Sequence, residues 1–214
     1  MNHVMFFLEI LGTIAFSVSG AIEAMKKEMD MLGVIVLGLV TAVGGGILRD
    51  IIIGNLPPAA FQNARNPLIA IVAACTAFVV GAIVSRRKHP KLTVIWNQVL
   101  LISDAIGLGA FTVLGIRYVQ EQTDYQNTAL LLFVGVVTGV GGGIIRDIFA
   151  GNIPYIFTKH VYATASIAGA VSYLVLEKTG HLLFAAIASV VLVLILRLLA
   201  AKFEWNLPRV HLNE

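Results

Sequence analysis

The stretch TAVGGGILRDIIIGNLP, residues 41–57, returns as TGVGGGIIRDIFAGNIP at residues 138–154. Twelve of the seventeen positions are identical at an offset of 97. Each copy places three consecutive glycines, an Arg-Asp pair and an Asn-x-Pro stop inside or just after a long apolar run, where all of them are costly. A costly pattern that occurs twice indicates a duplicated unit with a structural or functional purpose.

The composition is that of an integral membrane protein. Of the 214 residues, 58% are hydrophobic and 13% are charged, whereas soluble domains carry about 25% charged residues. The net charge of +3 reflects basic residues gathered in one set of loops, so nucleic acid is not an expected partner. The single cysteine, Cys75, excludes an intrachain disulfide.

Seven apolar runs are long enough to cross about 30 Å of hydrocarbon. The first is interpreted as a spanning helix rather than a cleaved signal peptide, because it lacks a basic leader and contains Glu9. The connectors are too short to hold a soluble domain. We therefore predict one all-α transmembrane domain over residues 1–214, with seven helices at about 5–24, 32–53, 68–85, 95–117, 129–150, 160–176 and 182–201.

The duplication extends beyond the glycine motif. EILGTIAFSVSG, residues 9–20, aligns at an offset of 95 with DAIGLGAFTVLG, residues 104–115. Each unit thus contains three helices, and because three is odd, the second unit enters the membrane in the opposite sense. We predict an inverted repeat, with repeat one at about 5–85, repeat two at about 95–176 and an unpaired seventh helix at about 182–201.

Loop charges predict the orientation, because cytoplasmic loops carry an excess of lysine and arginine. They place the N-terminus outside and the C-terminus in the cytoplasm. The predicted outer side holds only Arg65, Arg117 and Lys178 in or beside its loops. The predicted inner side holds Lys26, Lys27, Arg86, Arg87, Lys88, Lys91, Lys159, Lys202 and Arg209.

The glycine triplets lie a little past the middle of the second and fifth predicted helices, near the bilayer midplane. Three adjacent glycines weaken a helix, since each costs about 1 kcal/mol relative to alanine. Unwound backbone is tolerated in a membrane only inside the protein or along a wet cavity. We expect kinks that face an interior path; close helix packing is the alternative. The residues are Gly44, Gly45, Gly46, Gly141, Gly142 and Gly143.

Six charged side chains within the apolar runs are candidates for lining that path. Arg49 and Asp50 are neighbours, about 100° apart on a helix, so we expect their partners to come from elsewhere. Asp104, well inside its helix, is the strongest candidate. Snorkelling to the headgroups is the alternative for the arginines, and Arg197 is expected to be an interfacial anchor. The full set is Glu9, Arg49, Asp50, Asp104, Arg146 and Asp147.

The hydroxyls of Thr13, Ser17 and Thr112 follow these acidic residues along the first and fourth helices. They either line a pore or bond across helices. No histidine pair, CxxC motif or serine elbow is present, and the glycine-rich segments do not open a βαβ unit. We expect no catalytic residues, no metal site and no cofactor.

Two inverted three-helix units plus a seventh helix, each unit bearing GGGxxRD followed by GNxP, closely resemble the prokaryotic members of the trimeric intracellular cation channel (TRIC) family. The resemblance covers about residues 5–201, and the same sequence family is also catalogued as small glycine transporters. It implies a homotrimer among membrane lipids in the cell membrane. Each protomer would enclose an hourglass-shaped pore for K⁺ and Na⁺, with helices two and five kinked at their triplets.

Two functions of different classes therefore compete. The first is a monovalent cation channel, and the alternative is a secondary transporter for glycine or another small amino acid, since inverted repeats with broken helices are also transporter architecture. A channel gives resolvable current steps, whereas a carrier gives saturable uptake. A membrane scaffold would leave the buried charges unexplained.

Overall fold

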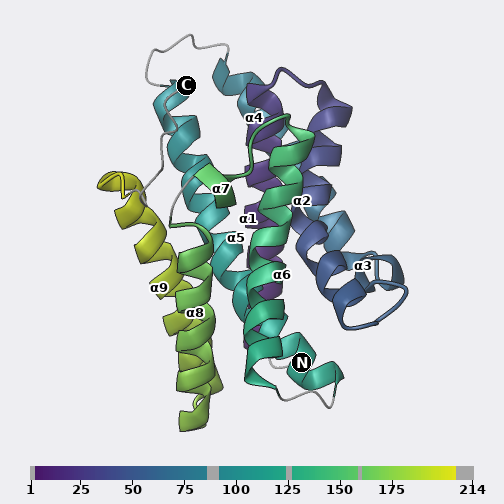
Figure 1. Cartoon of the computed structure of the whole chain (residues 1–214). Coiled ribbons are helices and arrows are strands. Elements are labelled where there is room, and N and C mark those ends of the chain that lie inside the picture. The colour runs from purple at the N-terminus through teal and green to yellow at the C-terminus, as the bar shows by residue number, and fades with distance from the viewer. Residues whose placement is uncertain (1–2, 86–91, 124–126, 159–160, 206–214) are drawn as a thin grey trace, which may run out of the picture.

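The structure is a computed structural model that describes residues 3–85, 92–123, 127–158 and 161–205. Within these ranges every regular element is a helix, as predicted (Figure 1). The basic residues Arg86, Arg87, Lys88, Lys91, Lys159 and Arg209 lie outside the described residues, and the orientation stays a prediction. The helices are α1 (His3–Lys26), α2 (Met31–Ile52), α3 (Ala59–Gln62), α4 (Arg65–Ser85), α5 (Leu92–Gln122), α6 (Thr128–Phe149), α7 (Tyr155–Thr158), α8 (Ala163–Leu176) and α9 (Leu182–Lys202), with a 3₁₀ turn, η1, at Glu177–Thr179.

Six of the seven predicted spans are confirmed by length and composition, namely α1, α2, α4, α5, α6 and α9. The remaining one, α8, has 14 residues, which at 1.5 Å per residue is about 21 Å, shorter than the hydrocarbon core. Its end has a local cause. The charged residues Glu177 and Lys178 form η1, and Gly180 adopts a left-handed φ of 80°, which terminates the helix.

The order of elements in α1 to α4 is repeated in α5 to α8, and the one-turn helices α3 and α7 lie at opposite ends of the bundle (Figure 1). The ends of α2 and α6 are built alike. Asp30 caps α2 by accepting from the Gly33 N–H, and Asn127, 97 residues later, caps α6. Both helices are followed by a glycine with left-handed φ, Gly54 at 73° and Gly151 at 68°. The GNxP segment is therefore a helix stop in both units.

The centre of the bundle is formed by α1 and α5, the first helices of the two units, with α2 and α6 packed beside them. Phe16 and Phe111, which are equivalent at an offset of 95, stack with ring centroids 5.3 Å apart. The unpaired helix α9 packs against α5 and α8. The inverted units thus share one interior rather than forming two separate cores.

The predicted unwinding at the glycine triplets is not present, because α2 and α6 are helical without interruption through both of them. The triplets instead allow the two backbones to touch. A Cβ built on Gly45 would collide with the Thr138 carbonyl oxygen, and one on Gly142 would collide with the Thr41 carbonyl oxygen. Close packing therefore explains these two glycines. Bending of the helix axes without unwinding stays a prediction.

The glycines of one triplet face three different surroundings. A Cβ on Gly44 would meet the Ile145 side chain at 2.7 Å, whereas one on Gly46 would have only the Arg49 guanidinium nearby, at 3.8 Å. Gly46 is partly exposed, while Gly44 and Gly45 are buried. Packing thus accounts for two members of this triplet and leaves the third facing open space.

The backbone contact between α2 and α6 predicts opposite effects for the same substitution at the adjacent positions 45 and 46. Gly45→Ala should destabilise the protein by about 1–3 kcal/mol, because the added methyl group overlaps the backbone of α6. Gly46→Ala should be neutral or stabilising by up to about 1 kcal/mol, since alanine favours the helix and meets nothing. Thermal unfolding of both variants in one detergent measures the difference. Equal unfolding temperatures for the two variants would contradict the close backbone contact between α2 and α6 at Gly45.

Candidate functional site

Arg49 and Asp50 bind each other, contrary to the sequence-based expectation. The Arg49 Nε donates to Asp50 Oδ1 at 2.9 Å, and its terminal NH2 lies 2.8 Å from the same oxygen. Asp50 Oδ2 accepts from the backbone N–H of Ala59, the first residue of α3, at 2.7 Å. The helix turns the two side chains about 100° apart, but the chain fold brings α3 back over Asp50 and the long arginine side chain wraps around to it.

The second motif repeats this arrangement. The Arg146 Nε donates to Asp147 Oδ1 at 2.9 Å, and Asp147 Oδ2 accepts from the backbone N–H of Tyr155 in α7 at 2.8 Å. Each Arg-Asp pair therefore fastens the end of a glycine-rich helix to the one-turn helix that follows. Both arginines are buried, Arg49 at 8% exposure and Arg146 at 0%, so snorkelling is not their role.

The asparagines of the two GNxP segments join the units to each other. Asn55 donates to the Tyr118 hydroxyl at 2.9 Å, and Asn152 donates to Glu23 Oε1 at 2.6 Å. Tyr118 and Glu23 are equivalent at an offset of 95. Each unit is therefore braced by the first helix of the other, at opposite ends of the molecule. The Arg49 guanidinium also lies 3.5 Å from the centre of the Tyr118 ring.

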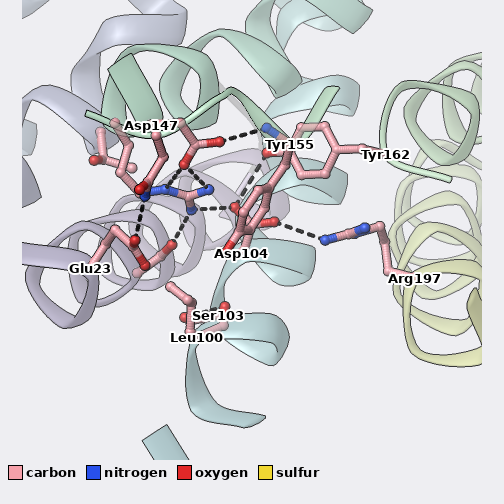
Figure 2. A network of polar contacts seen from close by, with 12 residues as sticks. Glu23, Leu100, Ser103, Asp104, Asp147, Tyr155, Tyr162 and Arg197 are labelled. Atoms are coloured by element: carbon pink, nitrogen blue, oxygen red, sulfur yellow. Dashed lines mark hydrogen bonds and ion pairs between the residues drawn. The ribbon is translucent and has the colours of Figure 1, made fainter. Parts of the chain in front are cut away.

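Asp104 of α5 is the centre of the second unit's polar cluster (Figure 2). Its Oδ1 accepts from the Arg146 NH1 at 2.6 Å and from the Tyr162 hydroxyl at 3.3 Å. Arg146 NH1 also donates to the Ser19 hydroxyl of α1 at 2.5 Å. Asp104 is 0% exposed, so its charge is compensated entirely by these neighbours.

Arg197 was expected to be an interfacial anchor, and the structure shows that this is wrong. Its NH2 lies 3.3 Å from Asp104 Oδ2, and the residue is 4% exposed (Figure 2). The helix α9 packs on α5, so an arginine on that face points inward. Nearby, burial raises the pKa of the Tyr155 phenol to about 12.

Glu9, the counterpart of Asp104, is held differently. It forms an ion pair with Arg65 at the start of α4 and accepts from the Asn66 side chain at 2.7 Å. It thus does not meet the arginine of its own motif. The Glu9 and Arg65 side chains are 23% and 36% exposed. The first unit's cluster is therefore open to solvent, whereas the second is sealed.

Two cavities reach into the bundle from opposite ends. The Glu9 cavity, about 150 Å³, lies at the end that carries α3, and its lining includes Glu9, Gly46, Arg49, Asp50 and Arg65. The Arg197 cavity, about 540 Å³, lies at the other end, and its lining includes Lys26, Asn97, Tyr155, Arg197 and Glu204. The two linings share no residue, and the buried Asp104 cluster lies between the ends. Among the described residues, no group of three His, Cys, Asp or Glu is placed to hold a metal ion.

The three predicted hydroxyls lie in different places. Thr13 lines the Glu9 cavity, and its buried hydroxyl has no hydrogen-bond partner in the described part of the chain. Ser17 donates to the Ala70 carbonyl at 2.6 Å, and Thr112 donates to the Leu108 carbonyl at 2.7 Å while contacting Ser166. Helix bonding therefore explains Ser17 and Thr112, and only Thr13 remains a candidate for lining a path.

Sequence reasoning missed Glu23 and Tyr118 as functional positions. The offset of 95 places the two residues at equivalent positions, but a glutamate and a tyrosine share no sequence match there. Their common role, a bond to a motif asparagine, is visible only in the structure. It also missed Tyr162 and the role of Arg197. For Arg197 the available signal was its position five residues inside the C-terminal end of α9, within an apolar run.

The chain matches a family model described as glycine transporter twice, over residues 6–83 and 101–178. The UPF0126 inner membrane protein YadS of Escherichia coli (strain K12) is 35% identical over 218 residues, which cover 99% of this chain and 98% of YadS. The UPF0126 membrane protein YvgT of Bacillus subtilis (strain 168) is 36% identical over 202 residues, which cover 94% of each chain.

Solved structures with the same fold include TRIC channels. One structure, described as "Structural basis for conductance through TRIC cation channels", is 37% identical to this chain. Its TM-score is 0.81, and the match covers 100% of both chains. A prokaryotic TRIC channel crystallised in 0.5 M KCl is 29% identical, has a TM-score of 0.85 and covers 97% of this chain and 100% of its own. The TRIC orthologue from Rhodobacter sphaeroides is 29% identical and has a TM-score of 0.84. The match covers 95% of this chain and 100% of the orthologue's chain.

These matches span nearly the whole chain and both repeated units. The protein is therefore a multi-pass membrane protein of the family whose model is described as glycine transporter, and it shares sequence and fold with the prokaryotic TRIC cation channels.

Proposed function

We propose that this protein is a monovalent cation channel of the cell membrane, permeable to K⁺ and Na⁺. The proposal includes a homotrimer with a separate ion path inside each protomer. Its support from relatives is that similar solved structures are described as cation channels, and one as a trimeric intracellular cation channel orthologue. The orientation we propose follows the loop charges, with the Glu9 cavity outside and the Arg197 cavity facing the cytoplasm.

The observation that carries the proposal is the alignment of two cavities with a buried charge cluster between them. The Glu9 cavity reaches inward to Thr13, Gly46 and Phe111. The Arg197 cavity reaches inward to Arg197, which contacts Asp104. Ionisable groups inside a membrane protein mark ion and substrate pathways because nothing else offsets their desolvation. A path from one cavity to the other therefore passes Asp104.

Carboxylates along this path would attract cations, and the arginines would limit how many can enter. The glycine triplets contribute space rather than freed carbonyls, since their helices are intact. Gly46 lines the Glu9 cavity, and Gly143 faces Asp104, whose Oδ1 would lie 3.7 Å from an added Cβ. Because Asp104 and Arg146 are both 0% exposed, we assign this arrangement to a closed state.

A second candidate function is secondary transport of glycine or another small amino acid. The observation that favours it is the chemistry of the Glu9 cavity, which combines two carboxylates with two guanidinium groups in about 150 Å³. Such a cavity has complementary charges for both ends of a small zwitterion. The two functions differ in rate, because a carrier must change conformation for each substrate that it moves.

Purified protein in liposomes and planar bilayers separates the two functions. As a channel, it should carry K⁺ and Na⁺ currents in resolvable single-channel steps and should show no saturable glycine uptake. Both assays should use one preparation, with protein-free liposomes as the control. Saturable glycine uptake in the absence of resolvable K⁺ steps would replace the channel proposal with the carrier.

The charge at the mouth of the Glu9 cavity predicts a salt-dependent effect. Glu9→Gln should lower K⁺ conductance roughly two-fold at low ionic strength, because the carboxylate no longer concentrates cations at the mouth. The reduction should disappear near 1 M salt, where the Debye length is about 3 Å.

Glu121→Gln is the matched control for this measurement. Glu121 is also paired with an arginine, Arg117, at the same end of the molecule, but it does not line the cavity. Its loss should leave the conductance unchanged. If the two variants behave alike at low salt, the Glu9 cavity is not the mouth of the conducting path.

A further inference from the structure

The two oxygens of Asp104 are held unequally. Oδ1 accepts from the Arg146 NH1 at 2.6 Å and from the Tyr162 hydroxyl at 3.3 Å. Oδ2 is contacted by Arg197 at the longer distance of 3.3 Å. Arg146 approaches from the duplicated motif, whereas Arg197 approaches from α9, which lies outside the duplication. One side of the carboxylate therefore depends on a residue that is not part of the repeated unit.

The two arginines also differ in how firmly they are fixed. Arg146 donates to Ser19, Asp104 and Asp147 at 2.5–2.9 Å. Its buried NH2 has no hydrogen-bond partner among the described residues, but it lies 2.8 Å from Asp147 Oδ1 in the ion pair. Among the described residues, Arg197 has one polar contact, the long one to Asp104, and its buried Nε has no hydrogen-bond partner. Its guanidinium lies 4.7 Å from the centre of the Tyr162 ring. A buried donor without a partner is unfavourable by about 1–3 kcal/mol. The present position of Arg197 is thus the less satisfied of the two.

Arg197 has space into which it can move. It lines the cavity of about 540 Å³ at its end of the molecule. A guanidinium that swings into this cavity gains water for its unpartnered Nε and uncovers Asp104 Oδ2. The cavity would then extend directly to the carboxylate, and its water could carry an ion there.

We propose that Asp104 Oδ2 is a binding site for the permeant monovalent cation and that the guanidinium of Arg197 occupies this site in the closed state. Arg197 is then a tethered cation that gates its end of the path. This inference rests on the proposed cation-channel function and assigns the gate to one residue. The gate is formed by charged side chains that the structure already brings together.

Charge balance supports an exchange between the guanidinium and a free cation. The buried cluster of Asp104, Asp147, Arg146 and Arg197 is neutral, with two negative and two positive groups. Removing one positive group alone would leave a buried uncompensated carboxylate, which is strongly unfavourable. A K⁺ ion that replaces the guanidinium restores the balance, so ion entry and gate opening are favourable only together.

The first unit contains the same kind of pair in an open form. Glu9, the counterpart of Asp104, is paired with Arg65, whose side chain is 36% exposed, while the Arg197 side chain is 5% exposed. A carboxylate covered by an arginine from outside the glycine motif thus occurs at both positions. At the Glu9 position water already reaches the pair, and at the Asp104 position it does not.

The test is the K⁺ current of Arg197→Met in planar bilayers, compared with wild type and with Lys202→Met. Methionine fills similar space without the charge, and Lys202 is an exposed cation on the same helix that does not line the cavity. Arg197→Met should raise the K⁺ current at least several-fold and increase the K⁺ over Cl⁻ permeability ratio. Lys202→Met should leave both unchanged.

A second substitution shows whether the effect acts through Asp104. Adding Asp104→Asn to Arg197→Met should abolish the gain in current and in cation selectivity, although it restores the charge balance. If Arg197 had a purely structural role, the K⁺ over Cl⁻ permeability ratio would not change in a way that depends on Asp104. Arg197→Lys keeps the charge on a shorter side chain, so it should give a smaller increase in K⁺ current than Arg197→Met. If Arg197→Met does not assemble, the current of Arg197→Lys decides the question.

The outcomes separate this inference from the function on which it rests. A wild-type protein without any K⁺ current would overturn the channel proposal itself. A conducting wild type whose current and permeability ratio match those of the Arg197 variants would overturn the gate alone. An increase that persists in the double variant would also overturn it, because the cation would then not be binding at Asp104.

Discussion

The structure depends on the ion pair between Asp104 and Arg146, which lies at 2.6 Å in a part of the bundle where both residues are 0% exposed. Neither charge is tolerable alone in an apolar interior, because its desolvation is offset only by the partner. The pair therefore fixes the positions of α5 and α6, and through Ser19, Tyr162 and Arg197 it also draws in α1, the start of α8 and α9. Five segments meet at this pair because the buried carboxylate and guanidinium need polar partners from all of them.

The inverted repeat supplies this centre with a framework and then departs from symmetry. Both units fasten their Arg-Asp pair to a one-turn helix, and both use the GNxP asparagine to bind the other unit. The equivalent positions Arg65 and Tyr162 differ, however, and only the second carboxylate receives an arginine from α9. The same construction is partly exposed around Glu9 and fully buried around Asp104, which is the asymmetry that a gate requires.

Patterns along the chain predicted the helices and the duplication, and they singled out Asp104 as a charge inside the bundle. They failed where an outcome depends on how separate segments return to one another. Neighbouring Arg49 and Asp50 pair with each other, and α3 folds back so that the Ala59 N–H bonds the second oxygen of Asp50. The triplet helices stay intact, and Gly45 and Gly142 instead allow backbone contact between α2 and α6. The inward position of Arg197 follows from the packing of α9 on α5. Its place inside an apolar run could indicate burial, but it could not indicate Asp104 as the partner.

The central claim is that a glycine-rich helix faces a wet path inside each protomer, and the thiol accessibility of position 46 tests it most directly. Gly46→Cys is placed in a Cys75→Ala background, where the new side chain meets only Arg49 and lines the Glu9 cavity. A small membrane-impermeant cationic thiol reagent is then added to one side at a time while K⁺ current is recorded. The account predicts inhibition from the side of the Glu9 cavity alone. Currents that resist the reagent from both sides, or that fall equally from either side, would contradict it.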